Sequence, residues 1–200
     1  QIEIVNELNQ FIDGLDLSDS GTLTSIYNNH NLTRTKIETG FSFNIPYTNK
    51  WSAYFGGKFG SISNSDADSF FHFFGGGSPG LKGYPYYSLQ GTDLMIGEIG
   101  LRIPVFKEKN YIIGPLSINN MTMGFENQFG DAWNRTNTYD QKGSIGVQLR
   151  ISGYSFYNYP TAIGIEYHQP QNQFYMDIGD GKNILYGDED RVYLNILFGF

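Results

Sequence analysis

The sequence has no cysteine, few charged residues and no long apolar run, and each of these absences excludes a class of protein. Without cysteine the chain can form neither a disulfide framework nor a thiolate metal site. No run of about 18 apolar residues occurs, which excludes a transmembrane helix. Because 13 Lys and Arg face 20 Asp and Glu, the net charge is −7 and no nucleic-acid partner is expected.

Histidine is also scarce, since only His30, His72 and His168 are present. None of them has the spacing of a metal cluster or lies in a nucleophile motif, so neither a metal nor a cofactor is predicted. Glu166 and His168 fall on the same face of a predicted strand and could form an acid/base pair, which defines a hydrolase hypothesis. A hydrogen-bonded structural pair is the favoured interpretation, and the protein is not predicted to be an enzyme.

Aromatic residues and glycine are abundant, with 16 Phe, 15 Tyr and 25 Gly in 200 residues. This composition favours strands and tight turns, so we expect one all-β domain over residues 1–200. The mean hydropathy of −0.35 is typical of a soluble protein. It is equally compatible with a membrane β-barrel, in which only every second side chain of a strand faces lipid.

Apolar and polar residues alternate in several segments, as they do in half-buried strands. The clearest pair is 36–45 and 51–60, separated by a short polar turn, which predicts a hairpin. Residues 2–11 are an ambiguous short strand, and the polar stretch 13–30 is interpreted as a long exposed loop. About seven or eight antiparallel strands result. The other predicted strands are 93–105, 116–129, 144–152, 161–168 and 192–200.

A soluble β-sandwich or a lipocalin-like barrel would have the same period. Two features favour a membrane barrel instead. One face of many strands is rich in Gly and Ser beside a few charges, and the apolar face carries aromatic residues near the strand ends. The expected fold is therefore an antiparallel transmembrane β-barrel segment.

One segment has a specific motif. Gly75, Gly76 and Gly77 lead through Pro79 and Gly80 into Leu81, Lys82, Gly83 and Tyr84, and the strand that follows ends in Leu101, Arg102, Ile103 and Pro104. This combination resembles the long loop and next strand of the BamA-type outer-membrane assembly and secretion superfamily (the bacterial surface antigen family). The resemblance implies that the chain is the C-terminal half of a sixteen-stranded barrel in the bacterial outer membrane.

The resemblance also implies which residues organise the interior of the barrel. The loop at about 64–91 would fold inward, with Lys82 in place of the family's Arg. Glu126 or Gln128 would be its partner on the wall, and Arg102 would match the family's strand Arg. Independently of the resemblance, charges buried inside a barrel need partners, so an interior network is expected; the alternative is that each residue contacts only luminal water. The network would consist of Lys58, Glu98, Arg102, Arg150 and Glu166. Because Lys lacks the planar fork of Arg, a looser point contact is expected. Tyr193, Phe198 and the final Phe200 would form the C-terminal signal for barrel assembly.

The function implied by the resemblance is insertion of outer-membrane proteins or polypeptide translocation across the outer membrane. The expected partners are outer-membrane lipid and lipopolysaccharide, unfolded client polypeptides, and the missing barrel half or periplasmic domains in the same or another chain. Since the chain begins at Gln1 rather than Met, it is expected to be a processed chain or a piece of a longer one. The alternative is a self-contained eight-stranded structural or adhesive outer-membrane barrel.

Overall fold

The fold is all-β and is taken from a computed structural model. It describes residues 1–17, 21, 23–65, 67–107, 109–156, 158–177 and 182–199. The strands are β1 (Ile2–Leu17), β2 (Leu23–Asn44), β3 (Ser52–Ile62), β4 (Phe73–Phe74), β5 (Gln90–Gly91), β6 (Asp93–Phe106), β7 (Tyr111–Ile113), β8 (Leu116–Trp133), β9 (Lys142–Ser155), β10 (Tyr159–Pro170), β11 (Phe174–Asp177), β12 (Asn183–Tyr186) and β13 (Arg191–Phe198).

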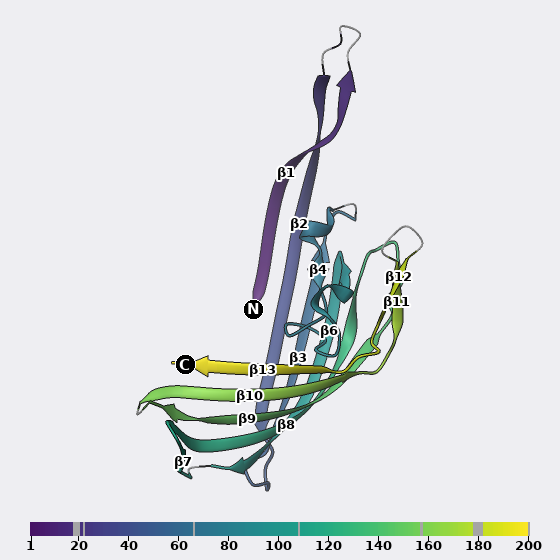
Figure 1. Cartoon of the computed structure of the whole chain (residues 1–200). Helices are drawn as coiled ribbons and strands as arrows, with labels where there is room; N and C mark the ends of the chain where they lie inside the picture. Colours follow the sequence, from purple (N-terminus) through teal and green to yellow (C-terminus); the bar gives the residue numbers. More distant parts are fainter. Residues whose placement is uncertain are drawn as a thin grey trace.

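Nine of these strands form one antiparallel sheet in the order β1-β2-β3-β6-β8-β9-β10-β13, with the short β7 paired to β8. The sheet is strongly curved, because β8, β9, β10 and β13 turn away from the direction of β1, β2, β3 and β6 (Figure 1). The inner side of this curve is called the hollow below. In the described part of the chain, β1 and β13 are the two edges and do not pair with each other. The predicted all-β fold and a sheet of about eight long strands are thereby confirmed.

The predicted strands from residue 36 onward are present, and most of them are slightly longer than expected. Asn44 pairs with Ser52, which confirms the hairpin between β2 and β3. β8 extends to Trp133 rather than ending near residue 129. Three small features had no pattern to predict them, because each has strands of only two to four residues: the β4–β5 pair, β7, and the β11–β12 hairpin.

The interpretation of residues 13–30 as an exposed loop is wrong. β1 continues to Leu17 and β2 begins at Leu23, and their ladder runs from Ile2 opposite Ile37 to Leu17 opposite Leu23. Only residues 18–20 and 22 of that stretch lie outside the described residues. A two-stranded ladder satisfies the backbone N–H and C=O groups whether or not the side chains are apolar, so a polar sequence does not prevent strand formation.

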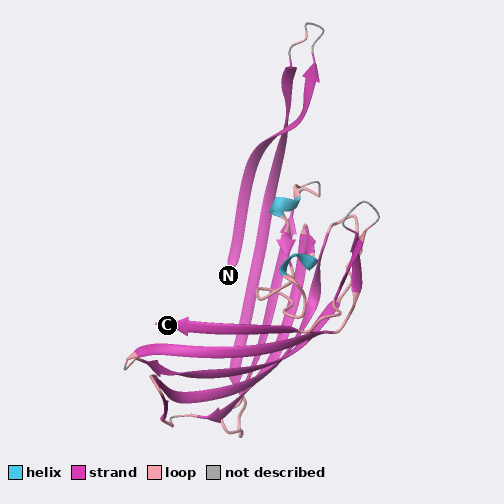
Figure 2. Cartoon of the chain, viewed as in Figure 1, coloured by secondary structure: helices cyan, strands magenta, loops and turns pink. Residues whose placement is uncertain are grey.

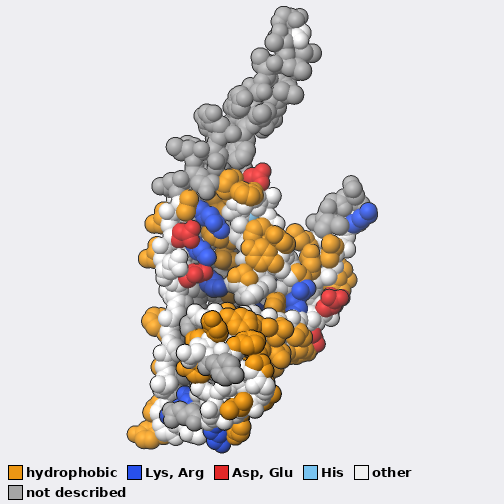
Figure 3. Space-filling view, turned by 60° about the vertical axis from the view of Figure 1, so that its left-hand side comes forward, with side chains coloured by type: hydrophobic (Ala, Val, Ile, Leu, Met, Phe, Trp, Pro, Cys, Tyr) orange, Lys and Arg blue, Asp and Glu red, His pale blue; other side chains and the backbone are white. Residues whose placement is uncertain are grey.

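The two faces of the sheet differ as the alternation predicts. The outward, convex face of β3, β6, β8, β9, β10 and β13 is apolar and exposed, whereas the inward, concave face of these strands carries many polar residues and glycines. On the surface in view, hydrophobic side chains form broad patches and charged side chains gather in a few groups (Figure 3). The exposed outward residues include Phe55, Phe59, Met95, Ile99, Met123, Phe125, Ile145, Val147, Ile165, Val192, Leu194, Ile196 and Phe198.

The segment between β3 and β6 lies in the hollow of the curved sheet, where Figure 2 shows its two short helical turns, Ser69–Phe71 and Tyr86–Ser88. It packs on the concave face, and its apolar residues form a buried cluster with residues of the wall, the one such cluster among the described residues. None of the described helices is long and apolar enough to cross a membrane. The cluster contains Leu32, Ile62, Ala67, Phe73, Leu81, Tyr84, Leu89, Leu94, Ile96 and Ala132.

Gly91 allows β5 to approach β8 closely, and its substitution should loosen the loop from the wall. A Cβ atom at Gly91 would lie 2.2 Å from the carbonyl carbon of Trp133, a backbone atom that cannot rotate away. We therefore expect Gly91→Ala to lower the free energy of unfolding by about 2 kcal/mol, the range of overpacked sites. Gly164→Ala is the control, because its nearest neighbour would be 3.8 Å away. Urea unfolding followed by tryptophan fluorescence would measure both, and equal midpoints would contradict the prediction.

Candidate functional site

The glycine-rich segment forms a tight turn that presents residues 81–84, here called the loop tip, to the wall of the sheet. The N–H of Leu81 donates to the Gly75 carbonyl at 2.7 Å, and the N–H of Gly80 donates to Gly77 at 3.0 Å. Gly77 has a φ of 72°, which glycine adopts without steric cost. A Cβ atom at Gly80 would lie 2.0 Å from the Gly75 oxygen. The turn therefore requires glycine at these points.

Leu81 and Tyr84 fix the loop tip through burial. Both are 0% exposed and belong to the apolar cluster between the loop and the wall. The Tyr84 hydroxyl lies 3.0 Å from the Gly143 carbonyl and 2.9 Å from the Asn172 carbonyl, and it accepts from the Asn172 N–H at 3.2 Å. Burial raises the pKa of this hydroxyl above its ordinary value. Tyr84 thus links the loop tip to β9 and to the segment that follows β10.

Gly83 lies against β9 more closely than any larger residue could. Its N–H donates to the Ser144 hydroxyl at 3.0 Å. An added Cβ would lie 2.7 Å from that hydroxyl and 3.0 Å from the backbone nitrogen of Pro170. The glycine of the motif therefore permits contact between the backbone of the loop tip and the wall.

The Lys82 ammonium lies between two carboxylates that come from different strands. It is 3.2 Å from Glu126 Oε2 on β8 and 2.8 Å from Glu166 Oε2 on β10. All three side chains are largely buried, with exposed fractions of 17%, 4% and 15% respectively. A charge removed from water needs a partner, and here one cation is shared by two anions.

The backbone of Lys82 is held on both sides as well. Its N–H donates to Gln128 Oε1 on β8 at 2.8 Å, and its carbonyl accepts from the Tyr193 hydroxyl on β13 at 2.7 Å. Lys82, Glu126, Gln128, Glu166 and Tyr193 are named the Lys82 cluster below. The cluster spans the concave face from β8 to β13.

Both wall residues proposed from the sequence therefore contact Lys82, one through its side chain and the other through its backbone. A single contact, looser than that of an arginine, was expected for Lys82. The ammonium instead contacts two carboxylates. Burial by itself would lower the pKa of Lys82, but Glu126 and Glu166 outweigh that effect and raise it. Because its pKa is raised, Lys82 stays charged at neutral pH.

Arg102 and Glu98 were also proposed as members of the interior network. Arg102 connects indirectly: its guanidinium carbon lies 4.4 Å from the centre of the Tyr54 ring, and the Tyr54 hydroxyl donates to Glu126 Oε2 at 2.8 Å. Glu98 lies on the inward face against Gly56. Among the described residues, neither Arg102 nor Glu98 forms an ion pair with Lys82.

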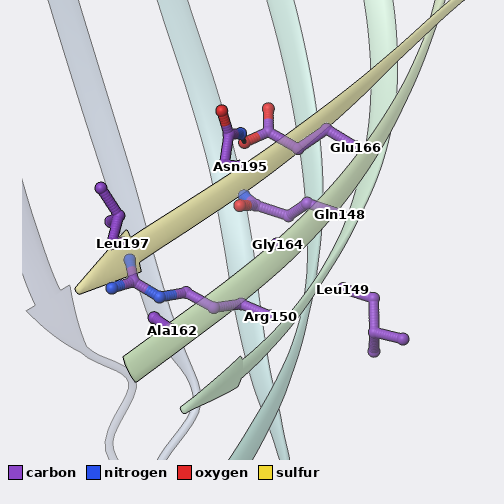
Figure 4. Close-up of a pocket in the computed structure, with 8 residues that line it drawn as sticks. All are labelled: Gln148, Leu149, Arg150, Ala162, Gly164, Glu166, Asn195 and Leu197. Carbon is purple, nitrogen blue, oxygen red and sulfur yellow. Dashed lines mark hydrogen bonds between the residues drawn. The ribbon is translucent and has the colours of Figure 1, made fainter. Parts of the chain in front are cut away.

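The remaining charges of that proposed network lie in separate places on the concave face. Lys58 donates to the Pro79 carbonyl just before the loop tip. Arg150 lies in the polar hollow beyond the cluster, as Figure 4 shows, where Gln148 and Asn195 also point inward and Leu149 points to the opposite face. Only Glu166 of this group joins Lys82 directly.

Glu166 has a full set of polar partners. Its Oε2 atom meets Lys82 and lies 3.4 Å from His168 Nε2, while its Oε1 atom accepts from Asn195 Nδ2 at 2.9 Å. His168 is 1% exposed, and its ring packs edge-on against Tyr193. The Glu166–His168 pair of the hydrolase hypothesis is present, but its carboxylate is engaged by a lysine and an amide.

The contacts of Lys82 with Glu166 and Tyr193 were not predicted: Glu166 was expected in the interior network without a named partner, and Tyr193 only in the C-terminal signal. The period of a strand gives the face of a side chain but not the residue opposite a loop. Of the proposed C-terminal signal, Phe198 is outward and exposed, Tyr193 points inward, and Phe200 lies outside the described residues.

A second ion-pair group lies where β8 ends and β9 begins. Lys142 is 3.2 Å from Asp131 and 3.3 Å from Asp140, and its ammonium lies 5.0 Å from the centre of the Phe174 ring. This group joins the wall to the β11–β12 hairpin. Among the described residues, no cluster of three or more His, Asp or Glu side chains could hold a metal ion.

No protein-family model, curated protein or solved structure matches this chain. The interpretation of the site therefore depends on its own geometry. In that geometry two consecutive residues of the loop tip attach the loop to the wall. Lys82 contacts β8, β10 and β13, and Gly83 contacts β9.

Removing the Lys82 charge should release the loop and destabilise the sheet. Lys82→Met leaves the Glu126 and Glu166 carboxylates buried without a cation, a loss of about 3 kcal/mol for a broken buried pair. We expect a matching fall in the free energy of unfolding and faster proteolysis within residues 64–91.

The double variant Lys82→Met, Glu126→Gln is the matched control for this prediction. Because it removes one of the two uncompensated charges, it should recover part of the lost stability. If Lys82→Met is as stable as the parent protein, or if the double variant recovers nothing, the ion pairs do not hold the loop.

Proposed function

We propose that this chain forms part of the wall of an outer-membrane β-barrel of the BamA-type superfamily, which inserts outer-membrane proteins or translocates polypeptides. The observation that carries the proposal is the loop tip bound to the concave face through the Lys82 cluster. This contact was expected from the motif at residues 75–84 and the resemblance it carries. The interior of a small barrel is filled by its own side chains and has no room for a long loop. A loop in the hollow therefore favours a larger barrel.

The apolar convex face supports the membrane location. Exposed large hydrophobic residues continue across β3, β6, β8, β9, β10 and β13, far beyond the single apolar patches common on soluble proteins. The polar concave face opposite them fits a water-filled interior. Under this proposal the convex residues contact lipid, and the loop organises the interior.

The proposed function also requires a way to guide the client polypeptide. A strand edge carries unpaired backbone N–H and C=O groups, which are a template for adding another strand. We infer that a client polypeptide is guided by a strand edge or along the polar interior. The self-contained eight-stranded barrel is the competing candidate, since the sheet has about that number of long strands.

Lipid contact predicts an asymmetric response to charge on neighbouring residues of β9. Val147 is outward and 42% exposed, whereas Gln148 lines the polar hollow. In a phospholipid bilayer, Val147→Arg should cost about 2–4 kcal/mol of stability, as charges near the bilayer centre do. Gln148→Arg should cost much less. Equal costs for the two variants would argue against lipid on the convex face.

The assembly function is tested by a reconstitution experiment. The full-length protein in liposomes should accelerate the folding of a small outer-membrane barrel added from urea, measured as the fraction that acquires heat-modifiable mobility in a gel. Liposomes containing an unrelated porin at equal mass are the control for bilayer defects. A rate no faster than this control would contradict the assembly function.

A further inference from the structure

Three short connections close one end of the sheet, here called the short-turn end (Figure 1). They are residues 45–51 between β2 and β3, residues 107–115 between β6 and β8, which include β7, and residues 156–158 between β9 and β10. The longer connections lie at the opposite end. These are residues 63–92, 134–141 and 171–190.

The short-turn end is basic, although the chain as a whole has a net charge of −7. Among the described residues of its three connections, the charged side chains are Lys50, Lys107 and Lys109, and Glu108 lies outside the described residues. On the surface in view in Figure 3, the lower end shows Lys or Arg side chains and no Asp or Glu. The longer connections are acidic instead, since their described residues include Asp68, Asp140, Asp177, Asp188, Glu189 and Asp190 beside Lys82, Arg135 and Lys182.

A groove of about 250 Å³ lies between the β2–β3 turn and the end of β6. Each of these two segments contributes one lysine to it, Lys50 from the turn and Lys107 from the residues after β6. Pockets for drug-sized ligands have volumes of roughly 300–1,000 Å³, so this groove suits a smaller group. It is lined by Asn49, Lys50, Pro104, Val105, Phe106 and Lys107.

The position of Lys50 is fixed by the turn that carries it. The Thr48 hydroxyl donates to the Ile45 carbonyl at 2.7 Å and accepts from the Trp51 N–H at 3.2 Å. The Lys50 N–H donates to the Thr48 carbonyl at 2.8 Å, and Lys50 has a φ of 62°, in the left-handed region. The side chain of Lys50 therefore starts from a defined point beside the groove.

The groove lies where the apolar convex face ends. Trp51 and Val105 are exposed and, by alternation, lie on the same face as Phe55 and Ile99, and the exposed Tyr111 follows in β7. Tryptophan and tyrosine are enriched at membrane–water interfaces, and lysine can lay its apolar stem on apolar surface while its ammonium stays among polar groups. This combination of residues fits the depth of lipid headgroups.

We propose that this groove binds the phosphate of an anionic phospholipid headgroup through the ammonium groups of Lys50 and Lys107. The inference rests on the outer-membrane location proposed above. Bacterial outer-membrane barrels have their short turns on the periplasmic side, so the lipid belongs to the periplasmic leaflet. Its acyl chains would lie along the apolar residues of β3 and β6, beginning with Trp51 and Val105.

Fluorescence quenching of Trp51 tests the headgroup site, because Trp51 is next to Lys50 and brominated acyl chains quench tryptophan on contact. The full-length protein is reconstituted into phosphatidylcholine vesicles that contain the same fraction of brominated phosphatidylglycerol or of brominated phosphatidylcholine. Subtracting the signal of Trp51→Phe isolates Trp51 from Trp133 and other tryptophans. We expect phosphatidylglycerol to be preferred at Trp51 by at least about tenfold, since each lysine near an anionic lipid contributes about fivefold.

Lys107→Gln should lower this preference about fivefold, and the double variant Lys50→Gln, Lys107→Gln should abolish it. Both lysines are exposed, so the variants should fold. Lys182→Gln is the matched control, because it makes the same change of charge at the opposite end and should leave the preference unchanged. Replacing both groove lysines by arginine should preserve the preference, because the charges remain.

Three results would overturn the headgroup site: the double variant keeps the preference, Lys182→Gln lowers it as much as Lys107→Gln does, or inorganic phosphate at constant ionic strength removes it. The last result would mean that the groove takes a free anion. Equal quenching by the two lipids would contradict the headgroup site alone. Absence of Trp51 quenching by either lipid would instead contradict the proposed membrane location.

Discussion

The position of the loop depends on a single buried ammonium group. Lys82 stands between Glu126 and Glu166, and it is the cation that these two buried carboxylates share. Because the two carboxylates belong to β8 and β10, satisfying the one cation also fixes the distance between these strands. The loop, the wall and the curvature of the sheet are therefore coupled through one electrostatic requirement.

This coupling is important because the sheet has little else on its concave side. Among the described residues, the sheets outside the main one are the two-stranded pairs β4–β5 and β11–β12, and the buried apolar cluster is confined to the region where the loop packs on the wall. The convex side is apolar but exposed, so it adds stability only where an apolar medium or partner covers it. In the proposed barrel, lipid covers the convex side, and the polar contacts of the loop tip take the place of a conventional core.

The sequence was sufficient for the parts of the structure that repeat. Strict alternation fixes the face of each side chain, so the hairpin of β2 and β3, the long strands and the inward position of Glu166 followed from the period alone. The extended β1–β2 hairpin did not, because a polar ladder has no amphipathic signature. The partners of Lys82 were only half predictable: Glu126 or Gln128 was expected from the family resemblance, whereas the contacts with Glu166 and Tyr193 depend on how far the sheet curves.

The presence of Lys where the resembled family carries Arg is explained by the number of carboxylates. A guanidinium presents a flat fork that suits one carboxylate held in a fixed plane. An ammonium is a compact charge with three donors that can point in different directions, which suits two carboxylates approaching from separate strands. Here Glu126 and Glu166 approach Lys82 from β8 and β10, at 3.2 and 2.8 Å. The lysine thus extends the contact from one strand of the wall to two, and its carbonyl extends it to β13.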